Sequence, residues 1–340
     1  MSAPLVAIDA DVLGRRRTGD ETYVANLLAE LGRLETGLRL VAITRHPELV
    51  PDGVEPYEVQ ARSQQLRMAV AVPRALRRLR PALVHFQYAL PPLPRVPAVV
   101  TVHDLSFERD PSAMGRLDRL TFRAVVPRAV RRAARVLTVS QRTKDDLVRL
   151  YRVRPSKVVV TPNGVDPVFA PAADGGGNGG YVLFVGAIQA RKDPLAALAA
   201  AEAAGLPLVA AGPEREPALA QELRSRGADL RGYVARDELV ELYRGAVALV
   251  LPSRYEGFGL PVLEAMASGT PVVATADPAL REVAGDAAVY ADRDELGEAL
   301  RRARIERARL VAAGLARAQT FSWAAAAKRT AEVYREVLAR

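Results

Sequence analysis

The chain has 340 residues, of which 49% are hydrophobic and 26% are charged. That length exceeds one ordinary domain, and the composition is typical of a soluble globular protein with buried cores. The absence of cysteine excludes disulfides, thiol nucleophiles and thiolate metal sites, and it fits a reducing compartment. We find no signal-peptide pattern at the N-terminus and no uninterrupted apolar stretch of membrane-spanning length. We therefore expect a cytoplasmic protein.

The net charge of +9 is distributed unevenly along the chain. Residues 1–165 hold 27 basic and 16 acidic side chains, a balance of +11, whereas residues 166–340 hold 21 and 23, a balance of −2. Only four of the 48 basic residues are lysines, which indicates a bias of the genome towards arginine. The sequence has no zinc-ligand spacing, no aromatic set of the kind that binds RNA and no tandem basic motif. We expect no nucleic-acid partner.

Short β-branched runs alternate with amphipathic segments along the whole chain. Strands are predicted at residues 5–8, 39–43, 83–85, 98–102, 136–139 and 158–161, and again at 181–185, 207–211, 246–251 and 271–274. Helices are predicted over residues 21–34, 115–134, 141–151 and 236–244, and a last one within 321–340. This alternation predicts the α/β class, with parallel sheets covered by helices on both faces.

A segment rich in proline and glycine, PVFAPAADGGGNGG at residues 167–180, divides the two series of elements. It has no periodicity and is predicted to be a linker. We therefore expect two Rossmann-like, doubly wound domains, at residues 1–168 and 181–320, that face each other across a cleft. Ligands of such sheets bind at the carboxyl ends of the strands, and the cleft is the expected site.

Two glutamates lie eight residues apart in PSRYEGFGLPVLEAMASGTPVV, residues 252–273. A glycine-containing loop follows a predicted strand, and Pro261 suits the first turn of the next helix. Residues 257–260 would thus present backbone N–H groups at a helix N-terminus, which favours binding of a phosphate. Glu256 lies in the loop and Glu264 lies one turn into the helix. Glu264 could accept hydrogen bonds from ribose hydroxyls, or it could merely stabilise the start of the helix.

A second candidate segment, FVGAIQARKD at residues 184–193, follows the strand predicted at 181–185. The adjacent cations Arg191 and Lys192 come directly after that strand and its loop. Two fixed cations at the carboxyl end of a strand could neutralise a departing diphosphate. The alternative interpretation is a solvated, charged loop.

Together these segments resemble the retaining GT-B glycosyltransferases of family 4. EGFGLPVLEAMASGTPVV resembles the Glu-x7-Glu signature of that family, VGAIQARKD resembles its VGTxxPRKN block, and PNGVDPVF, RGYV and VHDLSF match in chain order. The similarity covers nearly the whole chain. It implies the GT-B fold, in which a C-terminal helix, here residues 321–340, crosses back to pack on the N-terminal acceptor domain. One departure is Ala187, where some relatives have arginine; the cation here is Arg191.

The resemblance also implies roles for individual residues. Glu264 would hold the ribose hydroxyls, Glu256 would contact the donor sugar, and Arg191 and Lys192 would bind the diphosphate. His103 would face the donor sugar from the N-terminal domain. The other donor-binding positions lie after the first strand of the second domain, near the base, in the phosphate-binding turn and in the first loop of the chain: Gly186, Val234, Gly257, Phe258, Gly259, Leu260 and Gly19.

Three features suggest other chemistry. Asp9 and Asp11 form an Asp-x-Asp motif, which binds a metal in a different glycosyltransferase fold, but here no nucleotide-binding unit precedes it, so we expect no metal site. His85 belongs to no cluster with metal-ligand spacing and is interpreted as a structural or cleft-wall residue. The two glutamates could flank a glycosidic bond in a glycosidase, but a hydrolase would have no use for the phosphate-binding turn.

We therefore expect a metal-independent, retaining glycosyltransferase that moves a sugar from a UDP- or GDP-linked donor to an acceptor hydroxyl and needs no cofactor. A sugar-nucleotide epimerase of GT-B-like architecture and a non-catalytic nucleotide-sugar binding protein are the alternatives. The intact set of Arg191, Lys192, Glu256 and Glu264 argues against the binding protein.

The sequence does not identify the acceptor, but the basic charge of the N-terminal half bears on its class. Two sets of arginines each share a helical face within residues 115–135, namely Arg116, Arg119 and Arg123, and Arg128, Arg131, Arg132 and Arg135. A further cluster comprises Arg74, Arg77, Arg78 and Arg80. Such faces could hold the enzyme at the inner face of an anionic membrane or attract an anionic or lipid-linked acceptor. The alternative is a solvated, arginine-rich surface.

Overall fold

The structure is a computed structural model of the chain that describes residues 3–15, 18–92, 96–110, 114–173, 176 and 179–340. It divides into two compact units. The first comprises Met1–Leu105, Arg116–Gly164 and Trp323–Arg340, and the second comprises Ser106–Gly115 and Val165–Ser322. Residues 106–115, which we expected in the N-terminal domain, thus group with the second unit, while the last helix groups with the first.

The first unit is built on a seven-stranded parallel sheet in the order β3-β2-β1-β4-β5-β6-β7. Its strands are β1 (Leu5–Asp9), β2 (Arg39–Thr44), β3 (Glu55–Glu58), β4 (Leu83–Gln87), β5 (Ala98–Val102), β6 (Arg135–Thr138) and β7 (Val158–Val160). Its helices are α1 (Thr18–Arg33), α2 (Gln64–Leu66), α3 (Val72–Leu79), α5 (Arg116–Arg132), α6 (Gln141–Tyr151) and α14 (Trp323–Leu338). The strand order reverses between β1 and β4, which is where ligands of such sheets bind.

The second unit is built on a six-stranded parallel sheet in the order β10-β9-β8-β11-β12-β13. Its strands are β8 (Val182–Val185), β9 (Leu208–Ala211), β10 (Asp229–Gly232), β11 (Ala248–Leu251), β12 (Val272–Ala274) and β13 (Ala288–Tyr290). Its helices are α4 (Ser106–Arg109), α7 (Pro194–Ala203), α8 (Pro217–Ser225), α9 (Arg236–Gly245), α10 (Leu260–Ala267), α11 (Pro278–Ala284), α12 (Leu296–Ile305) and α13 (Arg307–Ala318). Here the order reverses between β8 and β11.

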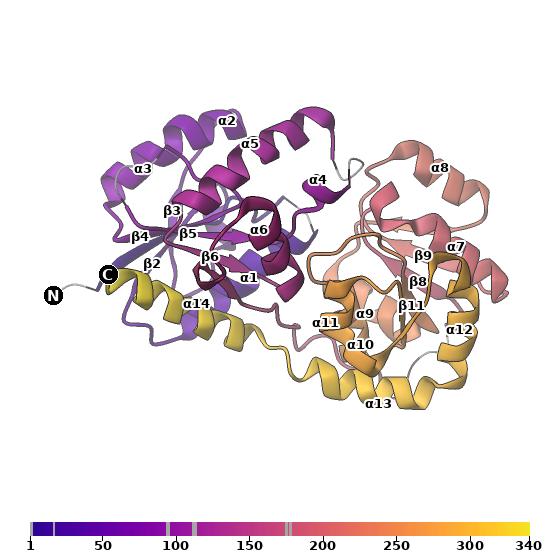
Figure 1. Ribbon diagram of the computed structural model, residues 1–340. Helices are drawn as coiled ribbons and strands as arrows, with labels where there is room; N and C mark the ends of the chain where they lie inside the picture. The colour runs from indigo at the N-terminus through magenta and orange to yellow at the C-terminus, as the bar shows by residue number, and fades with distance from the viewer. Residues whose placement is uncertain (1–2, 16–17, 93–95, 111–113, 174–175, 177–178) are drawn as a thin grey trace. The chain divides into compact units, whose positions relative to one another are not determined.

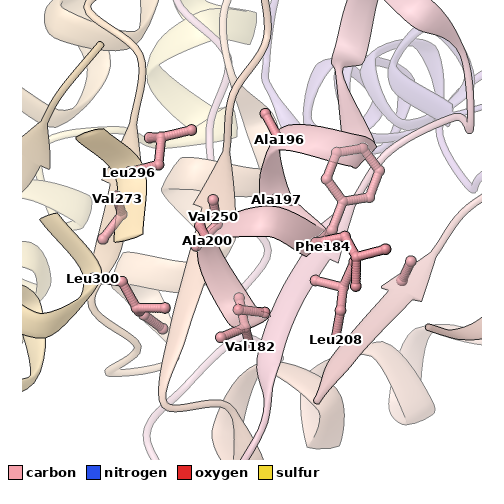
Figure 2. Packing of buried hydrophobic residues seen from close by; sticks show 14 of the residues in the cluster. Val182, Phe184, Ala196, Ala197, Ala200, Leu208, Val250, Val273, Leu296 and Leu300 are labelled. Atoms are coloured by element: carbon pink, nitrogen blue, oxygen red, sulfur yellow. The ribbon is translucent and has the colours of Figure 1, made fainter. Parts of the chain in front are cut away.

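The core of the second unit shows why its strands are continuous apolar runs. Val182, Phe184 and Val250 from the central strands are wholly buried under the alanine-rich helix α7 (Figure 2). Because both faces of a parallel sheet are covered, its strands need no polar face. The small side chains of Ala197 and Ala201 allow the helix to approach the sheet closely. This packing holds the loops after β8 and β11 on a rigid base.

The helix α14 packs against α1 in the first unit (Figure 1). The hydroxyl of Tyr334 on α14 lies 2.6 Å from Nδ1 of His85 on β4, and Nε2 of His85 lies 2.7 Å from Oγ1 of Thr101 on β5. Burial lowers the pKa of His85 to about 3, so its imidazole is neutral, with one donating and one accepting nitrogen. His85 is a structural residue that joins α14 to the sheet.

All strands predicted from the sequence are present, and the two-sheet α/β architecture is confirmed. The strands β3, β10 and β13 were not predicted from the sequence, and each lies at the edge of its sheet. Within the residues that the structure describes, no helix is both long and apolar enough to cross a membrane.

Candidate functional site

The loops after β8 and β11 meet at the point where the strand order of the second sheet reverses. β8 and β11 are hydrogen-bonded neighbours, with Val182 opposite Ala248. The two loops are joined directly, because the backbone N–H of Arg254 donates to the carbonyl of Arg191 at 3.0 Å. The two segments predicted from the sequence to bind a diphosphate and a sugar therefore lie side by side.

A charge pair links these two loops. The ammonium of Lys192 lies 2.5 Å from a carboxylate oxygen of Glu256, and the two side chains are only 14% and 7% exposed. The guanidinium of Arg191 donates to the carbonyl of Tyr255 at 2.5 Å and is also buried. Burial alone would raise the pKa of Glu256, but the charges of Lys192 and Arg191 outweigh it and lower that pKa. Glu256 is therefore ionised at neutral pH.

The turn that precedes α10 depends on Gly259. Its backbone has φ +105°, and a Cβ atom there would lie 2.6 Å from a methyl group of Leu280. Any other residue would be strained and would clash. Phe258, next to it, is buried with its ring centroid 5.9 Å from that of Phe321. Gly257, Phe258, Gly259 and Leu260 are thus held at the N-terminus of α10, as the sequence predicted.

Glu264 is oriented by Tyr243, a residue that no sequence motif marked. Its carboxylate accepts a hydrogen bond of 2.9 Å from the hydroxyl of Tyr243 on α9, which is wholly buried. Burial raises the pKa of Glu264 to about 7, although the hydrogen bond from Tyr243 acts in the opposite direction. No local motif marks Tyr243, because it comes from a different helix.

The remaining predicted donor-binding residues of the second unit also lie at the carboxyl ends of its strands. Gly186 directly follows β8, and its N–H donates to the carbonyl of Ala211 on β9 at 2.9 Å. A Cβ atom on the neighbouring Gly212 would lie 2.0 Å from the carbonyl oxygen of Gly186, so only glycine allows this approach. Val234 is half-buried in the loop between β10 and α9, beside Tyr233, whose side chain is 55% exposed.

His103 and Gly19 belong to the first unit. His103 follows β5, is 8% exposed and lies with its Nε2 2.9 Å from Oε1 of Gln87, at the end of β4. Burial lowers the pKa of His103, so the imidazole is neutral and its Nε2–H donates to Gln87. The ring of Tyr88 lies 5.5 Å from it, and Tyr88 has the strained backbone angle φ +58°. Gly19 is exposed in the first turn of α1.

Gln87 and Tyr88 were not identified from the sequence. Gln87 lies two residues after His85 on a strand, so both side chains point to the same face. A polar residue at the carboxyl end of a strand beside the reversal point was the available signal.

The carboxylates of Asp9 and Asp11 are occupied by arginines. Arg67, which is wholly buried, lies 2.6 Å from Asp9 and 3.0 Å from Asp11, and Arg45 makes two hydrogen bonds to Asp11 at 2.7 and 2.8 Å. Arg15 contacts Asp11 as well. In the part of the chain that the structure describes, no three acidic or histidine side chains come together as a metal site would require.

Comparison with known proteins identifies the family. Residues 17–169 match the family model Glycosyltransferase Family 4, and residues 175–304 match Glycosyl transferases group 1. O-antigen chain mannosyltransferase B of Escherichia coli is 30% identical over 267 residues, which are 70% of this chain and 70% of that protein. The chain belongs to the family 4 glycosyltransferases.

This glycosyltransferase has the same fold as several proteins of known structure. Sucrose-phosphate synthase of Thermosynechococcus elongatus superposes with a TM-score of 0.81 at 21% identity, over 99% of both chains. HepE of Anabaena, solved in complex with UDP and glucose, has a TM-score of 0.75 at 16% identity, over 98% of this chain and 100% of that one. These likenesses show the GT-B fold.

Proposed function

We propose that this enzyme transfers a sugar, with retention and without a metal ion, from a nucleotide-diphosphate sugar to an acceptor hydroxyl. The observation that carries the proposal is the convergence of Arg191, Lys192 and Glu256 at the reversal point of the second sheet, next to the N-terminus of α10. The name of the Escherichia coli relative, a mannosyltransferase, and the UDP bound to the Anabaena neighbour support it.

The donor would be held by groups that are already in place. Lys192, Arg191 and the N–H groups before α10 supply positive charge for the diphosphate. When Lys192 turns to the phosphates, Glu256 is released to accept a hydrogen bond from a sugar hydroxyl. Glu264 accepts hydrogen bonds from the ribose, and the loop at Val234 lies against the base.

The transfer would take place on one face of the sugar. The acceptor oxygen forms a bond to the anomeric carbon on the face from which the bond to the diphosphate breaks. The leaving phosphate oxygen takes the proton of the acceptor hydroxyl, so no side chain needs to act as nucleophile or base. Lys192 and Arg191 stabilise the negative charge that develops on the diphosphate. Nδ1 of His103, the nitrogen not bonded to Gln87, accepts a hydrogen bond from a sugar hydroxyl.

The test is a panel of UDP- and GDP-linked sugars assayed with and without acceptor, together with NMR of the anomeric configuration in the product. Release of nucleotide that depends on the acceptor, with retained configuration and unchanged by EDTA, is expected. Conversion of the sugar without an acceptor would indicate an epimerase, and binding without turnover of any donor would indicate a binding protein. Activity that is lost in EDTA and restored by Mn²⁺ would overturn the metal-independent mechanism.

For the acceptor we propose that the first unit binds an anionic or lipid-linked molecule at a membrane surface. Helix α5 exposes Leu117 and Leu120, by 81% and 63%, next to the exposed Arg116. Exposed leucines beside cations suit the interface of an anionic membrane.

A further inference from the structure

A basic hollow lies in the first unit, away from His103 and Gln87. It has a volume of about 600 Å³ and is lined by the end of α5, the end of α6 and the turn before β7: Arg131, Leu150, Tyr151, Arg152, Val153, Arg154 and Lys157. A second hollow of about 380 Å³ shares Arg154 and Lys157 and adds Arg135. We refer to the first of these as the basic hollow.

Four cations line the basic hollow without an acidic partner. Many arginines of this chain pair with a nearby carboxylate, as Arg39 does with Glu55 and Arg293 with Asp193. Across the described residues, in contrast, no carboxylate comes within ion-pair distance of the four cations, and no carboxylate lines the hollow: Arg131, Arg152, Arg154 and Lys157. Like charges gathered in a concave surface repel one another and attract anions.

The segment that carries three of these cations is anchored to the rest of the unit. Lys157 donates from Nζ to the carbonyl of Arg131 at 2.7 Å, which ties the turn before β7 to the end of α5. Burial, followed by the charges of Arg154 and Arg135, lowers the pKa of Lys157. Arg152 has φ +54°, an uncommon backbone conformation for a residue other than glycine. Val153, between two exposed arginines, is buried and anchors the segment.

The basic hollow and His103 lie at opposite ends of the strands of the first sheet. Arg131 lies at the end of α5, shortly before β6 begins, and Lys157 directly precedes β7, so the hollow is at the amino ends of these strands. His103 and Gln87 lie at the carboxyl ends of β5 and β4. In a parallel sheet the amino ends and the carboxyl ends of the strands are separated by the length of the strands. A ligand in the hollow is therefore not at the carboxyl ends of the strands, where ligands of such sheets bind next to the reversal of strand order.

We propose that the basic hollow is a second anion site that binds a group with two or more phosphate charges, such as a diphosphate. Three guanidinium groups can each bind oxyanions through paired N–H donors, and the ammonium adds a further charge. A single carboxylate would leave most of this charge unbalanced. The anion can be a diphosphate that is free in solution, or it can be the doubly charged phosphate head group of a membrane lipid.

The test measures binding of inorganic pyrophosphate by isothermal titration calorimetry. All proteins carry Lys192→Met, which removes one of the two cations proposed to bind the donor diphosphate. Arg152→Ser combined with Arg154→Ser is compared with a control pair, Arg62→Ser and Arg304→Ser, which removes the same charge from exposed positions elsewhere. Because each charge-assisted contact contributes about a factor of ten, we expect at least tenfold weaker binding in the hollow variant and less than a twofold change in the control.

The source of the anion is tested with phosphatidylcholine vesicles that contain phosphatidic acid. Vesicle binding that is lost in the hollow variant and kept in the control assigns the site to a lipid head group. Loss of pyrophosphate binding with unchanged vesicle binding assigns it to a free diphosphate. The proposal is overturned if the parent protein binds no pyrophosphate saturably, or if the hollow and control variants weaken binding equally. None of these results depends on glycosyl transfer.

Discussion

Glu256 and Glu264 lie in one loop–helix segment but have opposite electrostatic environments. Glu256 lies against two cations, which lower its pKa, whereas Glu264 faces the neutral hydroxyl of Tyr243, and burial raises its pKa to about 7. At neutral pH, Glu256 is fully ionised while Glu264 is divided between two forms. A carboxylate that must accept hydrogen bonds from two ribose hydroxyls does so best when ionised. Donor binding should therefore release a proton from Glu264.

The first prediction concerns the pH dependence of donor binding. Between pH 6 and pH 8 the ionised fraction of Glu264 rises, so the affinity of wild-type enzyme for a nucleotide sugar should rise by up to about tenfold. Glu264→Gln should bind more weakly and show no such slope. Calorimetry in buffers of different ionisation enthalpy would detect the released proton. An equal pH slope in both proteins would contradict the assignment of Glu264.

The same pKa has a consequence for stability. Because the folded pKa lies above the ordinary value of 4.5, the folded protein holds this proton more tightly than the unfolded chain does. The stabilisation due to that proton is fully present below pH 4.5 and is lost as the pH rises towards 7. The melting temperature of Glu264→Gln relative to wild type should therefore increase across this window.

The second prediction separates the two glutamates. Glu264→Ala should weaken nucleotide and nucleotide-sugar binding alike, by about 1.5–3 kcal/mol, because it removes a charged hydrogen-bond partner. Glu256→Ala should leave the affinity for free nucleotide unchanged or higher, because Lys192 loses its competing partner, while it reduces kcat. Equilibrium titration and steady-state kinetics on both variants test this. Unchanged nucleotide affinity in Glu264→Ala would refute the ribose contact.

At the scale of elements, α14 is the segment that covers α1 and completes the first unit. It comes from the end of the chain yet packs on α1, and the Tyr334–His85–Thr101 hydrogen bonds fix it to the central strands. Its inner face is apolar, with Trp323 lying 6.2 Å from the ring of Tyr23. Without α14 that face of α1 would be exposed.

The third prediction follows from the buried hydrogen bonds that join Tyr334, His85 and Thr101. Tyr334→Phe removes the hydroxyl and leaves Nδ1 of His85 unpaired, which should lower the free energy of unfolding by about 1–3 kcal/mol. Tyr233→Phe, at an exposed position, is the control and should have no effect. Truncation before Phe321 should destabilise the first unit more strongly. Calorimetry that detects melting of each unit is the measurement, and unchanged melting after truncation would exclude this role.

Two of the three strands that sequence patterns missed differ in burial from the central strands that they predicted. Central strands such as β5 and β11 are buried along their whole length and appear as apolar runs. The missed strands are at sheet edges, and β3, with the sequence EPYE, and β10, with DLRG, are largely exposed. The third, β13, with AVY, is mostly buried but has only three residues. An edge strand needs no apolar run, and proline is tolerated there. The residues of the Glu-x7-Glu and Arg-Lys segments were predictable because each has a local motif.

Pairings between distant segments were not predictable. Lys192 meets Glu256, and Tyr243 meets Glu264, through the order of strands in the second sheet rather than through any spacing in the sequence. The buried pairs of Arg67 with Asp9 and Asp11 likewise depend on the fold. Their effect is that an apparent metal motif is occupied by guanidinium groups.

At the scale of the whole molecule, charge is divided between the two halves of the chain. Residues 1–165, which supply most of the first unit, carry the net charge of +11, while residues 166–340 carry −2. The exposed arginines of α3, Arg74, Arg77 and Arg78, lie in this basic half, as do the exposed leucines of α5. A surface that combines cations with apolar side chains should favour an anionic membrane over a neutral one.

The last prediction tests this membrane contact. Each basic residue near an anionic surface contributes about 1 kcal/mol, and salt screens that attraction. The enzyme should therefore co-sediment with anionic vesicles at low salt, less at high salt, and hardly with neutral vesicles. Leu117→Ser combined with Leu120→Ser should weaken binding, whereas Ile305→Ser, at an equally exposed position of the second unit, should not.

Charge reversal of Arg74, Arg77 and Arg78 separates the two basic elements. If α3 also contacts the membrane, reversal should abolish binding to anionic vesicles, because attraction becomes repulsion. If vesicle binding persists after reversal but is lost with the two leucines, α5 alone makes the contact. Equal sedimentation with anionic and neutral vesicles would show that the basic half does not bind membranes, and a soluble anionic acceptor would then be the remaining explanation for its charge.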